Sequence, residues 1–530
     1  MRCDTLKNLP STFPLSRVQP LALAVALAFA GDACLAEAAM AISPVTPIGS
    51  QAGARLAMPK ALSSPRPDGS IMWIVENCND AGEGSLRDAA FHANHGDGID
   101  LGGLTCGTIS VTTGAITLHD VDLSGPGAEH LEITGFGNQG KRIFNHSGGG
   151  GTLSISGVTI RGGTYVSNAS LGGGCLRSTG GNHLVITDSV FRGCAVVTPL
   201  GQAGSALGGA IAFYGAGGIV HLYGTTIEGS LARTDHGSAG GGGLYAQGDV
   251  VMHASTIANN SVSASGSVSD FSGAISGGGL RTNGSVLIEN STLDGNTSSG
   301  DAGAALVGRG GTLLNSTVSH NIASAGVSGI VMSGYSSHTH IYSSTISGNV
   351  SERSQQGWSG GLYLYNKDVT ITNSTITGNS ETNQVGTNGT KFGAGIVFGP
   401  YAQNVTMSGT IVSGNYFDAG ETSHAADDIS CPTTLTILGD TNLVGWSHCQ
   451  PPADTNWISD PKLGPLQDNG GPTWTHMPLP DSAAVDHGAA HGFDTDQRGH
   501  ARVVGAAADI GSVESGNDRI FANGFDFDPN

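Results

Sequence analysis

The sequence predicts a right-handed parallel β-helix, an all-β solenoid whose short strands wind in successive coils. Three observations support this prediction. A motif recurs through the middle of the chain, alternating β-branched segments lie between glycine-rich turns, and no sustained 3.6-residue apolar period occurs within the repeats. A short helix at the N-terminal end and an irregular C-terminal segment are expected to cap the coils.

Each repeat opens on a glycine cluster with an apolar pair and closes on a Ser-Thr-apolar sequence. Gly242-Gly-Leu-Tyr and Ser255-Thr-Ile are examples. The closing apolar residues are Ile257, Leu293, Val318, Ile346, Ile376 and Ile411, which are 36, 25, 28, 30 and 35 positions apart. Periods in this range are typical of solenoids, so we expect these side chains to line one interior column.

Local sequence favours strands over helices in these repeats. Residues 285–289 and 368–372 are short, alternating and β-branched, while Gly, Asn and Ser between such stretches supply positive-φ turns. Asn290, Asn315 and Asn373 each precede a Ser-Thr pair, which predicts that they stack as an amide ladder. Repeat length varies most at residues 261–276 and 380–392, which predicts loops on one side, where solenoids often bind their ligands.

The expected N-terminal cap follows a first strand at residues 71–75. Ser85 is predicted to begin a helix and Gly96 to end it, with an apolar face along the side toward the coils. The residues on that face are Leu86, Ala89, Ala90 and Ala93.

Composition limits the choice of partners. The chain has 530 residues, 85 of them Gly, and a formal net charge of −20. This field repels nucleic acid and anionic lipid surfaces, and it repels acidic carbohydrate unless cations bridge the two. The simpler interpretation is a soluble, exposed surface. We therefore expect no nucleic-acid partner.

The N-terminus predicts export. Basic residues precede the apolar run 21–30, and small residues offer cleavage sites at Ala28–Ala30 or Ala36–Ala38. Residues 1–38 are thus predicted to be a signal peptide, and residues 39–70, rich in Ala, Pro and Ser, an unstructured leader. No later segment offers ~18 consecutive apolar residues, so no transmembrane helix is expected in the mature chain.

Cysteine usage agrees with export. Cleavage after Ala36 or Ala38 would remove Cys3 and Cys34 and leave six cysteines, namely Cys78, Cys106, Cys175, Cys194, Cys431 and Cys449. None shows C-x-x-C metal spacing, so a disulfide framework is the better interpretation. Neighbours in sequence form natural pairs, although six cysteines allow many connectivities. The separation between Cys175 and Cys194 suggests that they lie on neighbouring rungs.

Both ends of the repeat region resemble known families. Residues 77–87 and 96–101 are similar to the N-terminal cap of bacterial β-helix proteins related to polymorphic outer-membrane proteins and adhesins. Residues 460–476, 481–488 and 496–511 resemble the "choice-of-anchor Q" domain, which implies export but no settled activity. The resemblance covers residues 71–514. It divides the chain into a β-helix over 71–445, a C-terminal domain over 446–514 and a tail over 515–530.

The sequence does not assemble a convincing catalytic site. A polysaccharide lyase of this fold class would need acidic Ca²⁺ ligands beside an Arg or Lys base, yet Arg281 and Arg309 have no acidic cluster near them in sequence. Glycan hydrolysis needs two carboxylates about 5–10 Å apart. The adjacent pair Asp427 and Asp428 is predicted instead to lie in a solvated turn.

Metal and cofactor sites are equally weak in the sequence. His338 and His340 would point to one side of a strand, but no third ligand accompanies them, so surface residues are favoured. Asp494, Asp496, Asp509 and Arg498 are interpreted as a structural Asp–Arg network, with a Ca²⁺ site as the alternative. No residue is assigned to catalysis, to a metal or to a cofactor.

The expected protein is therefore a secreted or surface-displayed monomer, with the periplasm as an alternative location. It would act as a binding or adhesion scaffold for glycans or other surface polymers through its loop-rich side. A carbohydrate-active enzyme with a divergent site is the alternative, and a purely structural stalk is a third possibility.

Overall fold

The computed structural model describes residues 70–136, 140–167, 172–265, 274–352, 359–382, 393–418, 424–431 and 435–518. The predicted signal peptide and leader, with Cys3 and Cys34, lie outside these ranges. So do residues 266–273 and 383–392 of the two predicted loops, and residues 519–530 of the tail.

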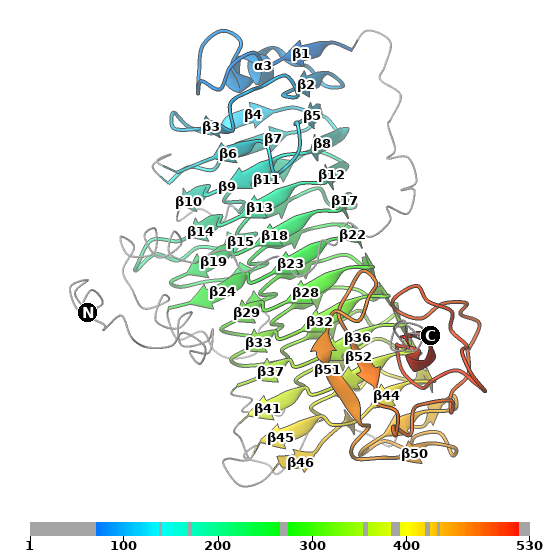
Figure 1. The fold of residues 1–530 in the computed structure, drawn as a ribbon. Helices are drawn as coiled ribbons and strands as arrows, with labels where there is room; N and C mark the ends of the chain where they lie inside the picture. Colours follow the sequence, from blue (N-terminus) through cyan, green and yellow to red (C-terminus); the bar gives the residue numbers. More distant parts are fainter. Residues whose placement is uncertain are drawn as a thin grey trace, which may run out of the picture. The chain divides into compact units, whose positions relative to one another are not determined.

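The described chain is a right-handed parallel β-helix (Figure 1). Four stacks of strands, called here sheets A to D, run along it, and a typical coil visits them in the order C, A, B, D. Nearly all neighbouring strands are parallel, because each is the equivalent of the strand one coil earlier. A coil is too small to hold a core alone, so stacking of coils buries the interior.

Sheets A and B carry the strands on two sides of each coil. Sheet A comprises β1 (Met72–Ile74), β2 (Gly98–Asp100), β5 (Asp122–Ser124), β8 (Thr152–Ser156), β12 (His183–Thr187), β17 (Ile219–Tyr223), β22 (Asp249–His253), β27 (Val286–Glu289), β31 (Gly311–Leu314), β35 (His338–Tyr342), β39 (Asp368–Thr372), β43 (Asn404–Ser408) and β48 (Ile437–Leu438). Sheet B comprises β3 (Thr108–Ser110), β6 (Glu132–Thr134), β9 (Thr159–Arg161), β13 (Val190–Arg192), β18 (Thr226–Glu228), β23 (Thr256–Ala258), β28 (Thr292–Asp294), β32 (Thr317–Ser319), β36 (Thr345–Ser347), β40 (Thr375–Thr377), β44 (Ile411–Val412), β49 (Leu443–Val444) and β50 (Asn456–Trp457).

Sheets C and D complete the coils. Sheet C comprises β4 (Ile116–Leu118), β7 (Phe144–Ser147), β11 (Leu176–Thr179), β16 (Ile211–Phe213), β21 (Leu244–Ala246), β26 (Leu280–Thr282), β30 (Ala305–Val307), β34 (Ile330–Met332), β38 (Leu362–Leu364), β42 (Ile396–Phe398) and β47 (Ile429–Ser430). Sheet D comprises β10 (Thr164–Val166), β14 (Ala195–Val197), β19 (Leu231–Thr234), β24 (Ser261–Ala264), β29 (Thr297–Ser298), β33 (Ile322–Ala323), β37 (Val350–Ser351), β41 (Ser380–Thr382), β45 (Tyr416–Asp418) and β46 (His424–Ala426). Between sheets D and C, a small side sheet contains β15 (Ala206–Leu207), β20 (Ala239–Gly240) and β25 (Ile275–Ser276).

The predicted interior column is present in sheet B. Ile257, Leu293, Val318, Ile346 and Ile376 are successive partners in register, and each is fully buried. The column then continues to Val412, because Ile376 pairs with Val412 rather than with Ile411. The prediction for Ile411 was therefore wrong by one position. Ile411 faces outward and packs with Leu443, Ala484 and Ile510, so its apolar side chain is covered by the C-terminal segment.

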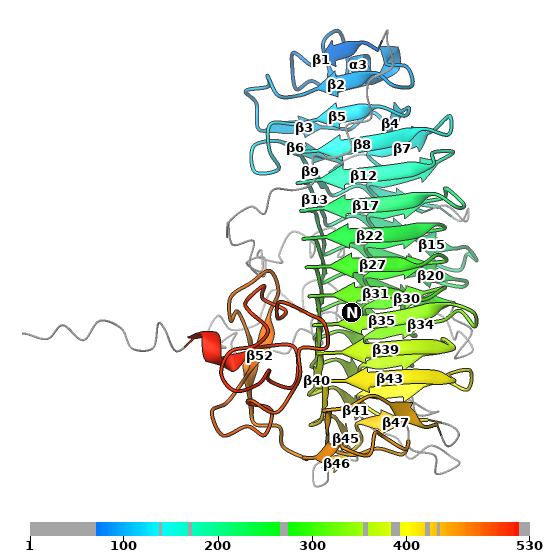
Figure 2. The same ribbon diagram turned by 90° about the vertical axis from the view of Figure 1, so that its right-hand side faces the viewer.

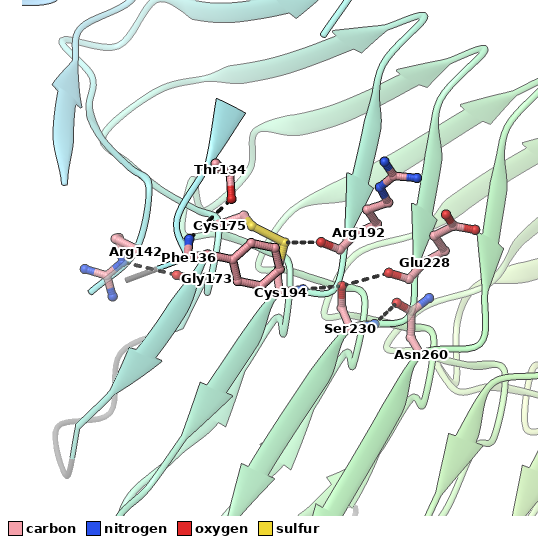
Figure 3. The surroundings of a disulfide bond; sticks show 10 residues. All are labelled: Thr134, Phe136, Arg142, Gly173, Cys175, Arg192, Cys194, Glu228, Ser230 and Asn260. Carbon is pink, nitrogen blue, oxygen red and sulfur yellow. Dashed lines mark hydrogen bonds between the residues drawn. A yellow bond between two sulfur atoms is a disulfide. The ribbon is translucent and has the colours of Figure 1, made fainter. Parts of the chain in front are cut away.

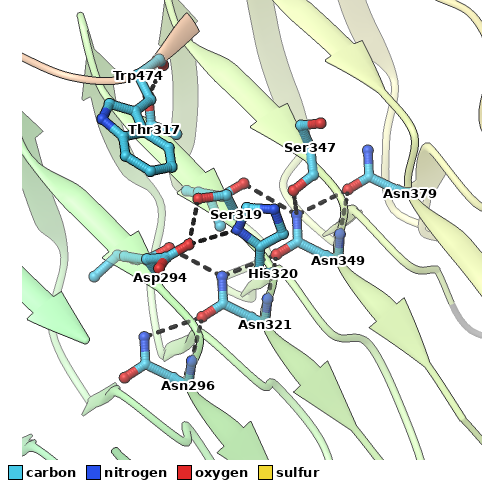
Figure 4. A network of polar contacts seen from close by, with 12 residues as sticks. Asp294, Asn296, Thr317, Ser319, His320, Asn321, Ser347, Asn349, Asn379 and Trp474 are labelled. Carbon is cyan, nitrogen blue, oxygen red and sulfur yellow. Dashed lines mark hydrogen bonds and ion pairs between the residues drawn. The ribbon is translucent and has the colours of Figure 1, made fainter. Parts of the chain in front are cut away.

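The amide ladder is formed by different asparagines from those predicted. Asn260, Asn296, Asn321, Asn349, Asn379 and Asn415 follow the sheet B strands, and each donates its side-chain N–H to the side-chain oxygen of the next (Figure 4). The final acceptor is Asp428. Asn290, Asn315 and Asn373 instead take positive φ angles of 48–50° at the turn between sheets A and B. That left-handed conformation is one that Asn tolerates, so these residues serve the bend.

A hydroxyl ladder follows this bend. Ser255, Ser291, Ser316, Ser344 and Ser374 each donate to the carbonyl two residues earlier and accept a backbone N–H from the preceding coil. For example, the Ser255 N–H donates to Ser291 Oγ at 3.1 Å. Buried backbone groups at the corner are thereby paired. This explains why each repeat closes on Ser-Thr.

The N-terminal cap is the helix α3 (Leu86–His92), which lies at the first coils. Ser85 Oγ accepts the Asp88 N–H, as expected of an N-terminal capping residue. The helix ends at His92 rather than continuing to Gly96, because Ala93 is already extended. Leu86, Ala89, Ala90 and Ala93 are all buried, as the sequence predicted.

The C-terminal segment returns along the outer face of sheet B, beside the lower coils in Figure 2. It contains an antiparallel pair, β51 (Leu463–Gln467) and β52 (Thr475–Pro478), and a 3₁₀ turn, η3 (Ser515–Asp518). Gln497 donates to Thr317 Oγ1 at 3.0 Å and accepts from Thr345 Oγ1 at 2.7 Å. Sequence-distant hydrogen bonds of this kind attach the segment to the threonines that face outward from sheet B.

Three disulfide bonds join Cys78 to Cys106, Cys175 to Cys194 and Cys431 to Cys449. The expectation that Cys175 and Cys194 lie on neighbouring rungs was wrong. Leu176 pairs with Ile211 of the next coil, 35 residues later, so a separation of 19 spans only part of one coil. The bond joins the residue before β11 of sheet C to a residue just after β13 of sheet B, within the same coil (Figure 3).

Candidate functional site

Four tyrosines gather at the turns between sheets C and A. Tyr363 comes from β38 and Tyr365 follows it, while Tyr335 and Tyr401 lie in the turns after β34 and β42. Ring centroids are 5.1 Å apart for Tyr335 and Tyr401, 6.4 Å for Tyr365 and Tyr401, and 4.5 Å for Tyr363 and Tyr365. We call these four residues the tyrosine cluster.

The tyrosine cluster is anchored at one end and open at the other. Tyr363 is buried, and packs in register between Val331 and Val397 on the outer face of sheet C. Tyr335 and Tyr401 are 58% and 48% exposed and meet edge to face. Exposed aromatic rings offer apolar faces with polar hydroxyl tips, which suits sugar rings that are themselves amphipathic.

A second feature is a groove on the outer face of sheet B, above the part covered by the C-terminal segment. Its volume is about 490 Å³. It is lined by Gly107, Thr108, Ala128, Glu129, His130, Leu131, Glu132, Thr159, Val190 and Arg192. We call it the sheet B groove.

Two glutamates near this groove occupy unequal environments. Glu132 accepts hydrogen bonds from Arg161 Nη1 and Arg192 Nη2, both at 3.2 Å. Glu228 lies one coil beyond Arg192 in register, and burial raises its pKa while Arg192 opposes the shift (Figure 3). A carboxylate held by guanidinium groups beside a carboxyl that favours its proton is an arrangement that general acid–base catalysis can use.

This arrangement was not predicted from the sequence. Arg161, Arg192 and Glu228 occupy the same position of successive sheet B strands, but they are 31 and 36 residues apart in sequence. A signal did exist, since each directly follows the interior residue Ile160, Phe191 or Ile227 of the column. Extending the repeat alignment toward the N-terminus would have revealed it.

A Ser–His–Asp set lies inside the coils. His146 Nδ1 is 2.7 Å from Ser178 Oγ, and His146 Nε2 is 2.9 Å from Asp120 Oδ1. Both Ser178 and His146 have 0% exposure, so an external substrate does not reach the hydroxyl in this structure. Asp120 also accepts the N–H groups of Gly149 and Gly151. The set therefore satisfies buried polar groups at the core and is not interpreted as a catalytic triad.

His338 and His340 lie on one strand, β35, as their spacing predicted. His338 and His340 point to the same side of β35, with ring centroids 6.3 Å apart, and His338 Nε2 is 3.4 Å from Asp368 Oδ2. Across the described ranges, no group of three or more His, Cys, Asp or Glu residues is arranged to hold a metal ion.

The interpretation of Asp427 and Asp428 as a solvated turn was wrong. Both are buried, and they directly precede β47 at the last coil of sheet C. Asp428 Oδ1 accepts the backbone and side-chain N–H groups of Asn415 at 2.9 and 2.8 Å. Burial raises the pKa of Asp428 to about 6.

The C-terminal segment contains the Asp–Arg network that its sequence suggested. Asp496 pairs with Arg498 at 2.9 Å with both side chains fully buried, and Asp509 accepts the N–H groups of Asp486 and Ser515. Asp494 contributes only its backbone carbonyl, to the Arg502 N–H. These bonds fix irregular loops. The carboxylates of Asp496 and Asp509 accept hydrogen bonds from other groups of the protein.

Comparison with known proteins supports the fold. A family model described as "Right handed beta helix region" matches residues 267–430. No curated protein and no solved structure gives a significant match to the chain. Within the described ranges, no helix has the length and apolar character needed to cross a membrane.

Proposed function

We propose that this chain is an exported β-helix protein, secreted or displayed on the cell surface, that binds carbohydrate through the tyrosine cluster. The observation that carries the proposal is the exposed pair Tyr335 and Tyr401, which ring contacts through Tyr365 connect to the buried Tyr363. Because stacked coils are rigid, little conformational entropy is lost when a ligand settles on such a surface.

Export is the second part of the proposal. Three disulfide bonds suit an oxidising compartment, and residues 1–38 read as a signal peptide followed by a leader over 39–70. We retain the β-helix over 71–445, the choice-of-anchor Q-like domain over 446–514 and the tail over 515–530 as the proposed organisation. Cell fractionation combined with N-terminal sequencing of the recovered protein would test location and cleavage together.

Binding is tested with tyrosine variants. The purified protein is screened on a glycan array, and polysaccharides that bind are quantified by affinity electrophoresis for wild type, Tyr335→Ala and Tyr401→Ala. We expect each substitution to weaken binding by roughly tenfold, since losing an aromatic contact is worth on the order of 1 kcal/mol or more.

The matched control is Tyr223→Ala, which removes a tyrosine from sheet A at a distance from the cluster. Its binding should equal that of the wild type. Equal binding by all three variants and the wild type would remove the tyrosine cluster from consideration. A protein that retains no glycan at all would instead support a structural stalk.

A carbohydrate-active enzyme is the second candidate, favoured only by the unequal glutamates near the sheet B groove. Neutral and uronate polysaccharides are assayed for new reducing ends and for unsaturated products, with and without Ca²⁺, using wild type and Glu228→Gln. We expect no turnover. The control is Glu289→Gln, on sheet A. If turnover disappears in Glu228→Gln but persists in this control, the protein is an enzyme and the binding proposal is wrong.

A further inference from the structure

The first strand of sheet A has an open edge. Among the described strands, β1 pairs only with β2 and stands at the end of its sheet. The Ile71 carbonyl and the Val75 N–H both form hydrogen bonds with β2. Because backbone groups alternate in direction along a strand, those of Met72 and Ile74 face away from β2. An edge of this kind is a template for one more strand.

Apolar side chains are exposed around this edge. The exposed fractions are 49% for Ile71, 37% for Met72, 55% for Ile74 and 82% for Phe91. Phe91 belongs to α3, which lies at the same end of the solenoid as β1 (Figure 1). We call the surface formed by Ile71, Met72, Ile74 and Phe91 the N-terminal tip. Clustered apolar residues on the surface of an exported protein indicate a binding surface.

Aromatic rings connect the two elements of the N-terminal tip. Trp73 of β1 stacks on His92 at a centroid distance of 5.3 Å, and His92 meets Phe91 edge to face at 5.2 Å. Trp73 packs against the interior core. The helix and the strand therefore present one continuous surface.

The charged residues at this end are almost all acidic. Residues 70–103 contain one Arg or Lys, Arg87, which pairs with Asp80 at 2.7 Å. The carboxylates in this range are Glu76, Asp80, Glu83, Asp88, Asp97 and Asp100. Glu76 and Glu83 are exposed. A complementary occupant would combine apolar side chains with positive charge.

The leader has this complementary composition. Residues 39–69 lie outside the described ranges and precede β1 directly in sequence. They contain Arg55, Lys60 and Arg66 and a single carboxylate, Asp68, whereas the whole chain has 22 basic and 42 acidic residues. The leader is therefore a basic segment of an acidic protein.

The pattern within the leader suits an added strand at an outer edge. Leu56, Met58 and Leu62 are separated by even numbers of positions, so they share one face of an extended segment. Pro59 and Pro65 are also an even number of positions apart, which directs both missing N–H groups to the same edge. That edge can face solvent, where proline prevents further pairing.

Covalent connection places the leader near the N-terminal tip and far from the tyrosine cluster. A flexible segment of about 30 residues has a root-mean-square span of roughly 30 Å. The tyrosine cluster adjoins β35, β39 and β43, which are nine to eleven strands from β1 in sheet A. At ~4.8 Å per strand this distance is at least about 40 Å. The tether therefore gives the leader its highest effective concentration at the tip.

We propose that the leader docks onto the N-terminal tip of its own chain and adds a strand to the open edge of β1. Residues 67–69, Pro-Asp-Gly, form a sequence that favours the required reversal of the chain. The apolar side chains of the leader would cover Ile74 and Phe91, and its basic side chains would face Glu76 and Glu83.

Docking would close the solenoid at this end. Strand addition supplies affinity through backbone hydrogen bonds. The composition of the leader predicts no structure of its own, so the segment would become ordered only at the tip. It would also prevent a second copy from pairing with β1. This role is independent of glycan binding.

Photo-crosslinking of the full exported protein tests the docking. The photoreactive amino acid p-benzoylphenylalanine replaces Phe91, and cross-linked peptides are identified by mass spectrometry. We expect cross-links within one chain to peptides from residues 39–69. The control position is Val503, which is 51% exposed in the C-terminal segment and should give no cross-link to the leader.

A substitution at the edge tests the contact itself. Ile74→Lys adds a like charge where the basic leader would dock, and lysine on an edge strand opposes strand addition. We expect the yield of the leader cross-link to fall by on the order of tenfold. The matched control is Leu287→Lys, which places the same side chain on β27, seven strands away in sheet A, and should leave the yield unchanged. Thermal unfolding verifies that both variants are folded.

Salt tests the electrostatic part of the contact. Raising NaCl from about 50 mM to about 500 mM should lower the yield of the leader cross-link, because salt screens exposed charges.

Several results would overturn the inference. Cross-links that join two chains would show that a second copy occupies the N-terminal tip. An equal leader yield in Ile74→Lys and wild type would show that β1 is not the docking edge. Absence of any leader cross-link, or an exported protein that begins after residue 69, would remove the leader as occupant. Glycan binding at the tyrosine cluster is measured separately and is unaffected by these outcomes.

Discussion

At the scale of single residues, Asp428 makes a prediction about pH. Burial raises its pKa from 3.8 to about 6, so the folded protein holds this proton more tightly than the unfolded chain does. Its stabilising contribution is therefore present below about pH 4 and is lost as pH rises toward 6. Asp428→Asn removes the ionisation and can still accept from Asn415. When the pH is raised from 4 to 8, the unfolding free energy of the variant should therefore increase relative to that of the wild type by on the order of 3 kcal/mol.

Thermal or urea unfolding at the two pH values measures this gain. Asp188→Asn is the control, because Asp188 is an exposed turn residue. There the difference in unfolding free energy between variant and wild type should be the same at both pH values. If Asp428→Asn also gave a constant difference, the carboxyl would not be held in its protonated form.

The structural roles of single residues could be predicted from the sequence in some places and not in others. Ser85 and the alanines of α3 were predictable because capping and helical spacing are local properties. Asp427 and Asp428 were not, since a pair of aspartates in an Ala/Ser context looks solvated until its neighbours in the fold, such as Asn415, are known. Asn290, Asn315 and Asn373 were assigned to the wrong ladder because Asn suits both a left-handed bend and an amide stack.

At the scale of the repeated element, the amide ladder should dominate the stability of the corner between sheets B and D. Asn349 accepts the backbone and side-chain N–H groups of Asn321 and donates to Val318 O and Asn379 Oδ1. Asn349→Ala leaves several of these buried groups unpaired, so we expect a loss of on the order of 3–5 kcal/mol in unfolding free energy.

The same element offers a control of identical residue type. Asn315→Gly alters an asparagine at φ 50°, where glycine is unstrained, and should change stability by less than about 1 kcal/mol. Denaturant titrations of both variants compare the two roles directly. Equal losses would mean that the ladder carries no special share of the stability.

Element spacing also explains which parts of the candidate site could be predicted. The interior column of sheet B was visible because its residues are apolar at every coil, whatever the coil length. The sheet B groove was not visible, because coils of 25 to 36 residues bring Arg192 beside Glu228 only once the register is known. Outward positions vary freely, so periodicity says little about them.

At the scale of the whole molecule, the proposed binding site and the C-terminal segment lie on different sides of the coils. The C-terminal segment covers the lower part of sheet B through Gln497 and its threonine partners, which leaves the sheet B groove open and Tyr335 and Tyr401 exposed. A solenoid can distribute roles in this way because each coil contacts only its neighbours. Substitution of Tyr335 or Tyr401 should therefore alter binding with little effect on the distant coils.

The disulfide between Cys175 and Cys194 tests this modular view. It joins two points of one coil, and replacing both cysteines with Ala removes a cross-link over 19 residues, for which chain entropy predicts a loss of about 3 kcal/mol. If stability is local, hydrogen exchange should quicken in β11 to β14 while β36 to β40 keep their protection. Glycan binding at the tyrosine cluster should then persist. Uniformly faster exchange along the chain would show instead that the coils unfold as one cooperative unit, and the separation of binding from stability would fail with it.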